Sequence, residues 1–199
     1  MYLSKSIFIL TFSFLIFSLS YSQEIINRDK QIVGITGYSP TSIIFLGKTP
    51  STTTTITKIE FRSITNMEIY GYPIYYQIGF IPYIEFDYPR RDEGNTRGKS
   101  KGFGISPLGL GITNEISRIV SISLYSYSGL ILMDKRFPTD KGKNLNYTFS
   151  LSVNTILRTS EHISLSLGYK FHHISNAQTG KENPGVDSNF ITLSLILSK

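Results

Sequence analysis

Strict alternation of apolar and polar residues limits the fold of this sequence more than any other feature. It is clearest in residues 145–154, where every odd position is apolar and every even position is polar. The pattern returns in residues 163–172 and 191–198, and a less regular version covers residues 76–87. Successive side chains of a strand point to opposite faces of a sheet, so these segments predict strands with one apolar and one polar face.

Two architectures produce such alternation: a soluble sandwich or barrel with its apolar face inside, and a membrane barrel with its apolar face toward lipid. The charged residues Lys58, Glu60 and Arg62 alternate with residues such as Ile59 and Phe61, which favours a narrow lumen where opposite charges pair. Strands of about 9 to 11 residues also suit a tilted crossing of the bilayer. We therefore predict an all-β fold, an eight-stranded antiparallel transmembrane β-barrel of the bacterial outer membrane.

The expected strands follow from this pattern, and their even number agrees with closure of a bacterial barrel. They are residues 30–37, 53–63, 75–88, 101–112, 118–132, 144–157, 162–174 and 189–198. The segment 64–74 could extend either of its neighbours. The longer connections, which would face outside the cell, are 38–52, 89–100, 133–143 and 175–188. The short connections 113–117 and 158–161 would be periplasmic turns.

The N-terminus has the layout of a secretory signal peptide. A single cation, Lys5, precedes a mostly apolar stretch at 7–19, and Ser20 and Ser22 are small residues at a cleavage point. A retained helical anchor is the alternative, but the apolar stretch is shorter than the roughly 20 residues that a spanning helix needs. We expect a signal peptide at 1–22 and a barrel domain at 23–199. The absence of cysteine excludes disulfides and a thiol nucleophile.

Basic residues gather in two of the predicted outward connections. Residues 90–101 hold five Lys or Arg and two acidic residues, and residues 134–143 hold four and two. They could be ordinary solvated loops. Alternatively, they attract the phosphates of lipopolysaccharide, because clustered cations raise the local concentration of anionic partners.

The stretch FHHISNAQTGKENPGVD, residues 171–187, contains the candidate catalytic residues. Strand parity places His172 in the lumen, near Lys58, Glu60 or Glu85. The same parity places His173 and Ser175 on the outer wall. The parity of the last strand, carried back from residues 191–197, places Asp187 on the outer wall too. The last two strands are joined directly, so Asp187 should lie near His173 and Ser175.

A histidine, a serine and an aspartate that converge form the set that nucleophilic catalysis needs. Ionisable residues at membrane depth are also costly and therefore candidates for function. We predict His173, Ser175 and Asp187 as catalytic residues and Asn176, next to the serine, as the oxyanion donor. The competing interpretation is a polar cluster at a turn, because His-x-Ser is a short pattern and Asn183-Pro184-Gly185 is a turn signal.

HISNA, followed by NPGVD and a short final strand, resembles the outer-membrane lipid A 3-O-deacylases of the PagL type, an acyloxyacyl hydrolase family. The resemblance implies that Ser175 attacks an ester of lipid A, His173 transfers the proton, Asp187 orients His173, and Asn176 stabilises the oxyanion. The chain departs from the family at two positions. It has Asp187 where the best-known members have glutamate, and Gln178 where members often have glycine.

The resemblance therefore implies a serine esterase that removes a hydroxy-acyl chain from lipid A of lipopolysaccharide. Its expected partners are that lipid and the outer membrane, with no nucleic acid, and self-association into a homodimer is left open. The proposed chemistry requires neither a cofactor nor a metal. The alternative is a non-enzymatic small outer-membrane barrel with a structural or partner-binding role.

Overall fold

The computed structural model describes residues 30–90 and 96–199. The predicted signal peptide, residues 1–22, lies outside the described residues. Within the described ranges, no helix is long and apolar enough to cross a membrane.

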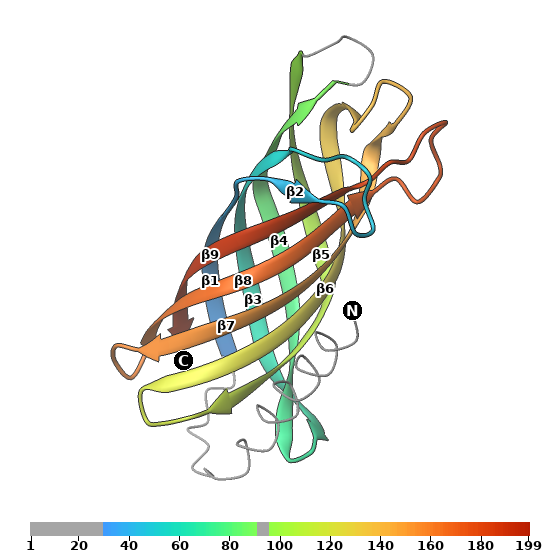
Figure 1. Ribbon diagram of the computed structural model, residues 1–199. Coiled ribbons are helices and arrows are strands. Elements are labelled where there is room, and N and C mark those ends of the chain that lie inside the picture. The colour runs from blue at the N-terminus through green and yellow to red at the C-terminus, as the bar shows by residue number, and fades with distance from the viewer. Residues whose placement is uncertain (1–29, 91–95) are drawn as a thin grey trace, which may run out of the picture.

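Eight long antiparallel strands close into a barrel (Figure 1). Consecutive barrel strands are neighbours, and the last, β9, pairs with the first, β1, along residues 31–38 of β1. A two-residue strand, β2, is added beside β9. The elements are β1 Lys30–Ser39, β2 Ser42–Ile43, β3 Thr53–Ile69, β4 Tyr72–Pro89, β5 Arg97–Glu115, β6 Val120–Phe137, β7 Lys143–Arg158, β8 Ile163–Ser175 and β9 Val186–Ser198. The predicted eight-stranded antiparallel barrel is confirmed.

The barrel wall is apolar on its outside and polar on its inside. On β7, the apolar residues Leu145 to Val153 are 38–49% exposed, whereas the alternating polar residues Asn146 to Asn154 are at most 9% exposed. An apolar exterior band around a polar interior is the arrangement that a barrel in lipid requires. The alternation in the sequence therefore separates a lipid-facing surface from a lumen.

Ion pairs occupy the middle of the lumen. Glu60 lies 3.0 Å from the Lys58 ammonium and 2.7 Å from the Arg62 guanidinium, and it also accepts a hydrogen bond from Tyr127. Lys170 lies over the Tyr127 ring, 5.0 Å from its centroid. The predicted pairing of opposite charges in the lumen is thus observed around Glu60.

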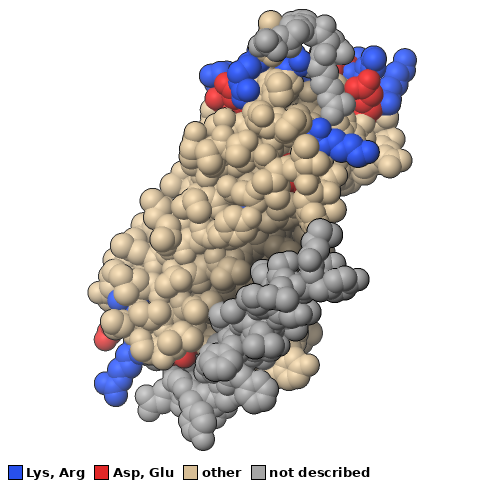
Figure 2. All heavy atoms as spheres, viewed as in Figure 1, with Lys and Arg blue, Asp and Glu red and all other residues tan. Residues whose placement is uncertain are grey.

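Apolar side chains fill the end of the lumen that is remote from the C-terminus, here called the outer end. A buried cluster there includes Phe86 and Phe137, whose ring centroids are 4.5 Å apart, together with Ile174 and Phe190. The outer end is also where lysine and arginine gather on the molecular surface (Figure 2). The barrel interior is therefore packed with side chains, as expected for eight strands.

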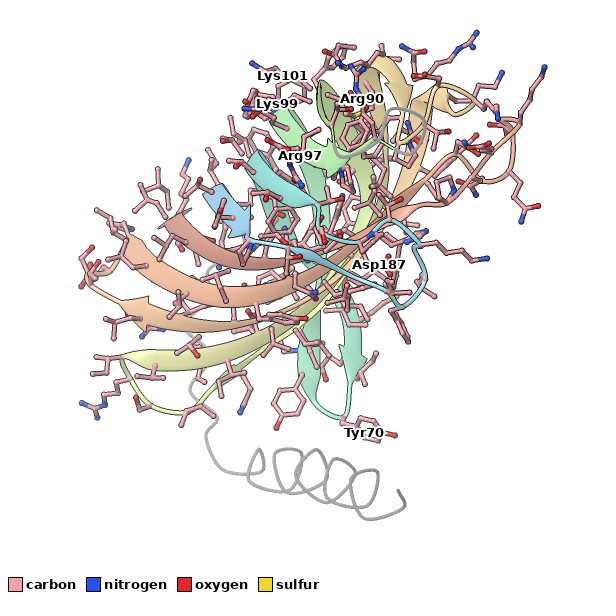
Figure 3. The ribbon with its side chains drawn as sticks, turned by 45° about the horizontal axis from the view of Figure 1, so that its top comes forward. Tyr70, Arg90, Arg97, Lys99, Lys101 and Asp187 are labelled. Atoms are coloured by element: carbon pink, nitrogen blue, oxygen red, sulfur yellow. The ribbon has the colours of Figure 1, made fainter. Side chains whose placement is uncertain are left out.

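The structure resolves the ambiguous segment 64–74 into a hairpin. β3 and β4 both extend beyond the predicted limits and meet at Tyr70 and Gly71, at the end opposite the basic residues (Figure 3). Both turn residues have positive φ, 52° and 79°, as a two-residue type I′ hairpin turn requires. Glycine adopts this conformation without steric cost.

A bulge in β4 reverses the strand parity. The register with β5 shifts between Ile81 and Ile84, so Phe80 is exposed on the outer wall but Phe86 is fully buried inside. Glu85 consequently lies on the outer face, where its carboxylate is 3.3 Å from the Lys101 ammonium. The expected position of Glu85 beside His172 in the lumen was wrong, because a prediction from uninterrupted alternation cannot detect an inserted residue.

Candidate active site

The β8–β9 hairpin brings His173 and Asp187 together. They are direct cross-strand partners, and His173 Nδ1 lies 2.6 Å from Asp187 Oδ1. Because a carboxylate only accepts hydrogen bonds, this contact requires the proton to be on Nδ1 when the imidazole is neutral. The Nε2 atom is then the basic nitrogen, which is the tautomer that a general base of a catalytic triad uses. Asp187 thus reaches the histidine although it is shorter than glutamate.

The second oxygen of Asp187 is held by three backbone N–H groups. Phe45, Leu46 and Gly47 donate to Asp187 Oδ2 over 3.1, 2.6 and 2.7 Å. These residues belong to the segment 43–48, here called the strap, which crosses the outer face of the barrel near the outer end of β9 (Figure 1). Asp187 is completely buried beneath it (Figure 3). The carboxylate is therefore covered, not at the surface of the outer wall.

The strap is attached to the β8–β9 hairpin at both of its ends. At one end, the short β2 pairs Ile43 with Asp187. At the other end, the Lys48 N–H donates to the Pro184 carbonyl over 2.6 Å. Between them, Gly47 lies against Gly185, so closely that a Cβ on Gly47 would be 2.9 Å from the Gly185 carbonyl carbon. A side chain at Gly47 would therefore separate the strap from the hairpin.

Sequence reasoning missed the strap because it follows no alternating pattern. Its apolar residues Ile43 to Leu46 are consecutive and remain 42–72% exposed. A run of four apolar residues followed by glycine inside a connection between strands was the available signal.

Ser175 ends β8 on the same outward-facing set of residues as His173. Among the residues that the structure describes, no hydrogen bond joins the Ser175 hydroxyl to His173. Residues two apart on a strand are separated by roughly 6.5–7 Å at Cα. The imidazole extends from one position and the serine hydroxyl rotates at the other, so this separation is within the combined reach of the two side chains. Tyr147 of β7 is the cross-strand partner of Ser175.

Asn176 is fully buried and organises the turn that follows β8. Its side-chain N–H donates to the Glu182 carbonyl over 2.7 Å, and its backbone N–H donates to the Asn183 side chain over 2.9 Å. Ala177 and Gln178 continue the chain with positive φ values of 50° and 60°. Gln178 thus adopts the left-handed backbone conformation that glycine adopts most readily, at the position where the resembled family often has glycine.

The other two histidines lie apart from this site. His172 is buried in the lumen as predicted, but its Nδ1 atom is 2.7 Å from the Ser150 hydroxyl instead of near an acidic residue. His162 lies in the turn between β7 and β8, where its carbonyl accepts a hydrogen bond from Ser198. Adjacent histidines 172 and 173 therefore have separate environments on the two sides of the wall.

Cations and acids alternate across the outer ends of β4 and β5. Arg97 is paired with Asp87, Lys99 lies 3.9 Å from the same carboxylate, and Lys101 is 3.3 Å from Glu85. All three cations remain 45–65% exposed and lie at the outer end of the barrel (Figure 3). This group supplies exposed positive charge on the outer face.

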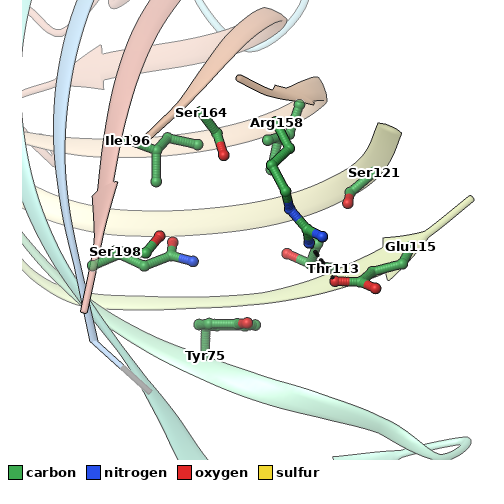
Figure 4. Close-up of a pocket in the computed structure, with 10 residues that line it drawn as sticks. Tyr75, Thr113, Glu115, Ser121, Arg158, Ser164, Ile196 and Ser198 are labelled. Atoms are coloured by element: carbon green, nitrogen blue, oxygen red, sulfur yellow. Dashed lines mark hydrogen bonds and ion pairs between the residues drawn. The ribbon is translucent and has the colours of Figure 1, made fainter. Parts of the chain in front are cut away.

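A polar cavity lies at the end of the lumen opposite the outer end (Figure 4). Arg158 and Glu115 form an ion pair of 3.0 Å there, and Arg158 also donates to the Arg118 carbonyl. The cavity contains no histidine. In the described part of the chain, no group of histidine and acidic residues is arranged to hold a metal ion. The His173–Asp187 pair therefore remains the better candidate for chemistry.

Comparison with known proteins gives one family match. Residues 121–195, from β6 to β9, match the family model described as lipid A 3-O-deacylase (PagL). No curated protein sequence matches the chain significantly.

Two solved structures share the fold. One is described as the outer membrane enzyme PagL, with a TM-score of 0.54 and 13% identity over 83% of this chain and 98% of that chain. The other is Neisserial surface protein A (NspA), with a TM-score of 0.54 and 10% identity over 85% and 97%. The protein is thus an eight-stranded β-barrel of the bacterial outer membrane whose residues 121–195 match the lipid A 3-O-deacylase (PagL) family.

Proposed function

We propose that this protein is a serine esterase that removes an ester-linked hydroxy-acyl chain from lipid A. The observation that carries the proposal is the His173–Asp187 hydrogen bond of 2.6 Å, on the same outward-facing set of residues as Ser175. The match of residues 121–195 to a lipid A deacylase family supports lipid A as the substrate. The proposed chemistry uses only residues of this chain.

In the proposed reaction, Ser175 Oγ attacks the ester carbonyl carbon while His173 Nε2 takes its proton. Asp187 holds the imidazole in the required tautomer and stabilises its protonated form. Collapse of the tetrahedral intermediate breaks the bond to the sugar oxygen, which receives the proton from His173, and leaves the acyl group on Ser175. Water, activated by His173, then releases the fatty acid and restores the serine.

Asn176 is the proposed oxyanion donor. A side-chain amide has two N–H bonds, and one of those of Asn176 already donates to the Glu182 carbonyl. Only the second can stabilise the developing negative charge. The order of the 176–183 turn therefore matters for this role.

The surroundings suit a lipid substrate. Phe149 is the cross-strand partner of His173, and Phe171 precedes it on the same face. Acyl chains in the outer leaflet can thus reach Ser175 without leaving the membrane. Lys99 and Lys101 lie on β5, which β6 and β7 separate from β8, so these cations suit the phosphates of lipid A molecules in the surrounding leaflet.

Replacing the nucleophile tests the proposal. Ser175→Ala should abolish the loss of an acyl chain from lipid A, followed by mass spectrometry, because no hydroxyl remains to form the acyl-enzyme. Ser166→Ala is the matched control, since Ser166 lies on the same strand but faces the lumen. Both variants should keep the shifted electrophoretic mobility of a folded barrel.

Undiminished deacylation by the Ser175→Ala variant would overturn the proposed mechanism. A folded wild-type protein that leaves lipid A intact would instead favour the alternative, a non-enzymatic barrel with a structural or partner-binding role. The absence of a hydrogen bond between Ser175 and His173 is the observation that makes this alternative worth testing.

A further inference from the structure

We infer that the strap is a working part of the active site, in which the N–H groups of Phe45, Leu46 and Gly47 hold Asp187 in the orientation that His173 needs. The inference rests on the proposed esterase function for its chemistry. It makes Gly47 a positioning residue, because Gly47 acts on the reaction only through Asp187.

The geometry of the carboxylate supports this role. One oxygen, Oδ1, faces His173, and the other, Oδ2, accepts all three strap hydrogen bonds. Together these contacts fix both the position and the plane of the carboxylate. Without the strap, the short Asp187 side chain would be free to rotate about χ1 and χ2 away from the imidazole.

Burial gives the three donors a second role. Asp187 is completely buried on the lipid-facing side of the barrel, where a carboxylate without hydrogen-bond partners would be costly. Backbone N–H groups satisfy it without introducing a competing cation. Hydrogen bonds to an ionised acceptor are also stronger than neutral ones. The strap therefore allows an aspartate to remain beside His173 in a water-poor environment.

The two glycines explain how the strap comes close enough. A Cβ on Gly47 would lie 2.9 Å from backbone atoms of both Gly185 and Val186. A Cβ on Gly185 would lie 2.9 Å from the Cε1 atom of His173, and Gly185 has a φ of +62°. The contacts at Gly47 are with backbone atoms, so they cannot relax by rotating a side chain. A methyl group at Gly47 should therefore lift the strap from Asp187 while leaving His173, Ser175 and Asp187 unchanged in sequence.

The test compares Gly47→Ala with a matched control, Gly34→Ala. Gly34 lies on the outer face of β1, and a Cβ there would meet nothing within 4 Å. We expect kcat for lipid A deacylation to fall roughly 10- to 100-fold in the Gly47→Ala variant, because a displacement of about 1 Å in a catalytic group has effects of this size. KM should change less than about threefold, since the strap contacts the acid and not the ester. The control should match the wild type.

Nuclear magnetic resonance of the full-length protein, labelled with 15N-histidine in micelles, supplies a readout that is independent of activity. The chain has three histidines, so His162 and His172 give internal reference signals. In the Gly47→Ala variant, the Nδ1 proton of His173 should exchange faster with solvent and its nitrogen signals should move, whereas the reference signals stay. This measurement is informative even if the wild type proves inactive, in which case the proposed function fails but the strap is still tested.

A Gly47→Ala protein with wild-type kcat and wild-type His173 signals would overturn the inference. So would a variant in which all three histidine signals move together, because that result indicates a general change of fold. If Gly47→Ala does not fold, Leu46→Pro decides the question. It removes the 2.6 Å donor without adding a methyl group between the glycines, and it should move the His173 signals in the same direction.

Discussion

At the scale of single residues, the sidedness of the strand separates two histidines that look equivalent in the sequence. His172 is buried in the lumen beside Ser150, and His173 contacts Asp187 beneath the strap. The polar partner of each is determined by the neighbouring strands. Their roles therefore follow from register, because a shift by one residue would exchange their environments.

The length of the acid at position 187 is testable at this scale. Asp187→Glu should lower kcat roughly tenfold, because the extra methylene has no space between His173 and the three donors of the strap. Asp187→Asn should lower kcat further, roughly 100- to 10,000-fold, because an amide favours the wrong imidazole tautomer. Both rates would be measured as release of fatty acid from lipid A.

The two substitutions at position 187 serve as controls for each other. If Asp187→Asn retained more activity than Asp187→Glu, a negative charge at this position would be unnecessary, and the orienting role of Asp187 would be wrong.

At the scale of elements, the sequence predicted what depends on regular alternation and missed what interrupts it. The strands β7, β8 and β9 lie close to their predicted limits, and parity placed His173, Ser175 and Asp187 on one face. The β4 bulge reversed the direction of Glu85, and the strap was assigned to an unstructured connection. A bulge and a backbone-mediated contact leave no periodic pattern, because the first inserts a residue and the second uses N–H groups that every residue except proline has.

The outer face of β5 offers a test of substrate recognition. Along this face, Lys99 and Lys101 are followed by the exposed apolar residues Phe103 and Ile105, as expected at the boundary between phosphates and acyl chains. Lys99→Gln combined with Lys101→Gln should raise KM for bisphosphorylated lipid A about three- to tenfold, because the two cations no longer raise the concentration of this lipid around the barrel. KM for dephosphorylated lipid A should stay nearly constant.

Thermal stability should change little in this double variant, because ion pairs with such exposed lysines contribute roughly 0–1 kcal/mol. Arg118→Gln, at the opposite end of the barrel, is the control for loss of positive charge. An equal rise in KM for both substrates would exclude phosphate recognition by these lysines.

At the scale of the whole molecule, the residues that stabilise the barrel and the residues proposed for the chemistry lie on opposite sides of the barrel wall. The polar network of the lumen connects β3, β6 and β8 across the barrel through Glu60, Tyr127 and Lys170. The candidate site uses outward-facing residues and a strap outside the barrel. Each strand therefore contributes its inward residues to the packing of the barrel and its outward residues to contact with lipid.

This division predicts that the ion-pair network of the lumen can be disrupted, and the free energy of unfolding lowered, without loss of activity. Glu60 is the buried acid among the basic side chains of Lys58, Arg62 and Lys170, so Glu60→Gln leaves the ion pairs with Lys58 and Arg62 without their acid. Removing one member of a buried ion pair typically costs about 3–5 kcal/mol. Urea unfolding of the Glu60→Gln variant in micelles should show a free energy of unfolding that is lower by that amount. Under folding conditions, kcat of the variant should stay within about twofold of wild type. The control is Gln77→Met, because the buried Gln77 amide has no hydrogen-bond partner within residues 30–90 and 96–199 and its replacement should cost little. A Glu60→Gln protein that is stable but inactive would show that the lumen and the outer-wall site are coupled, contrary to this division.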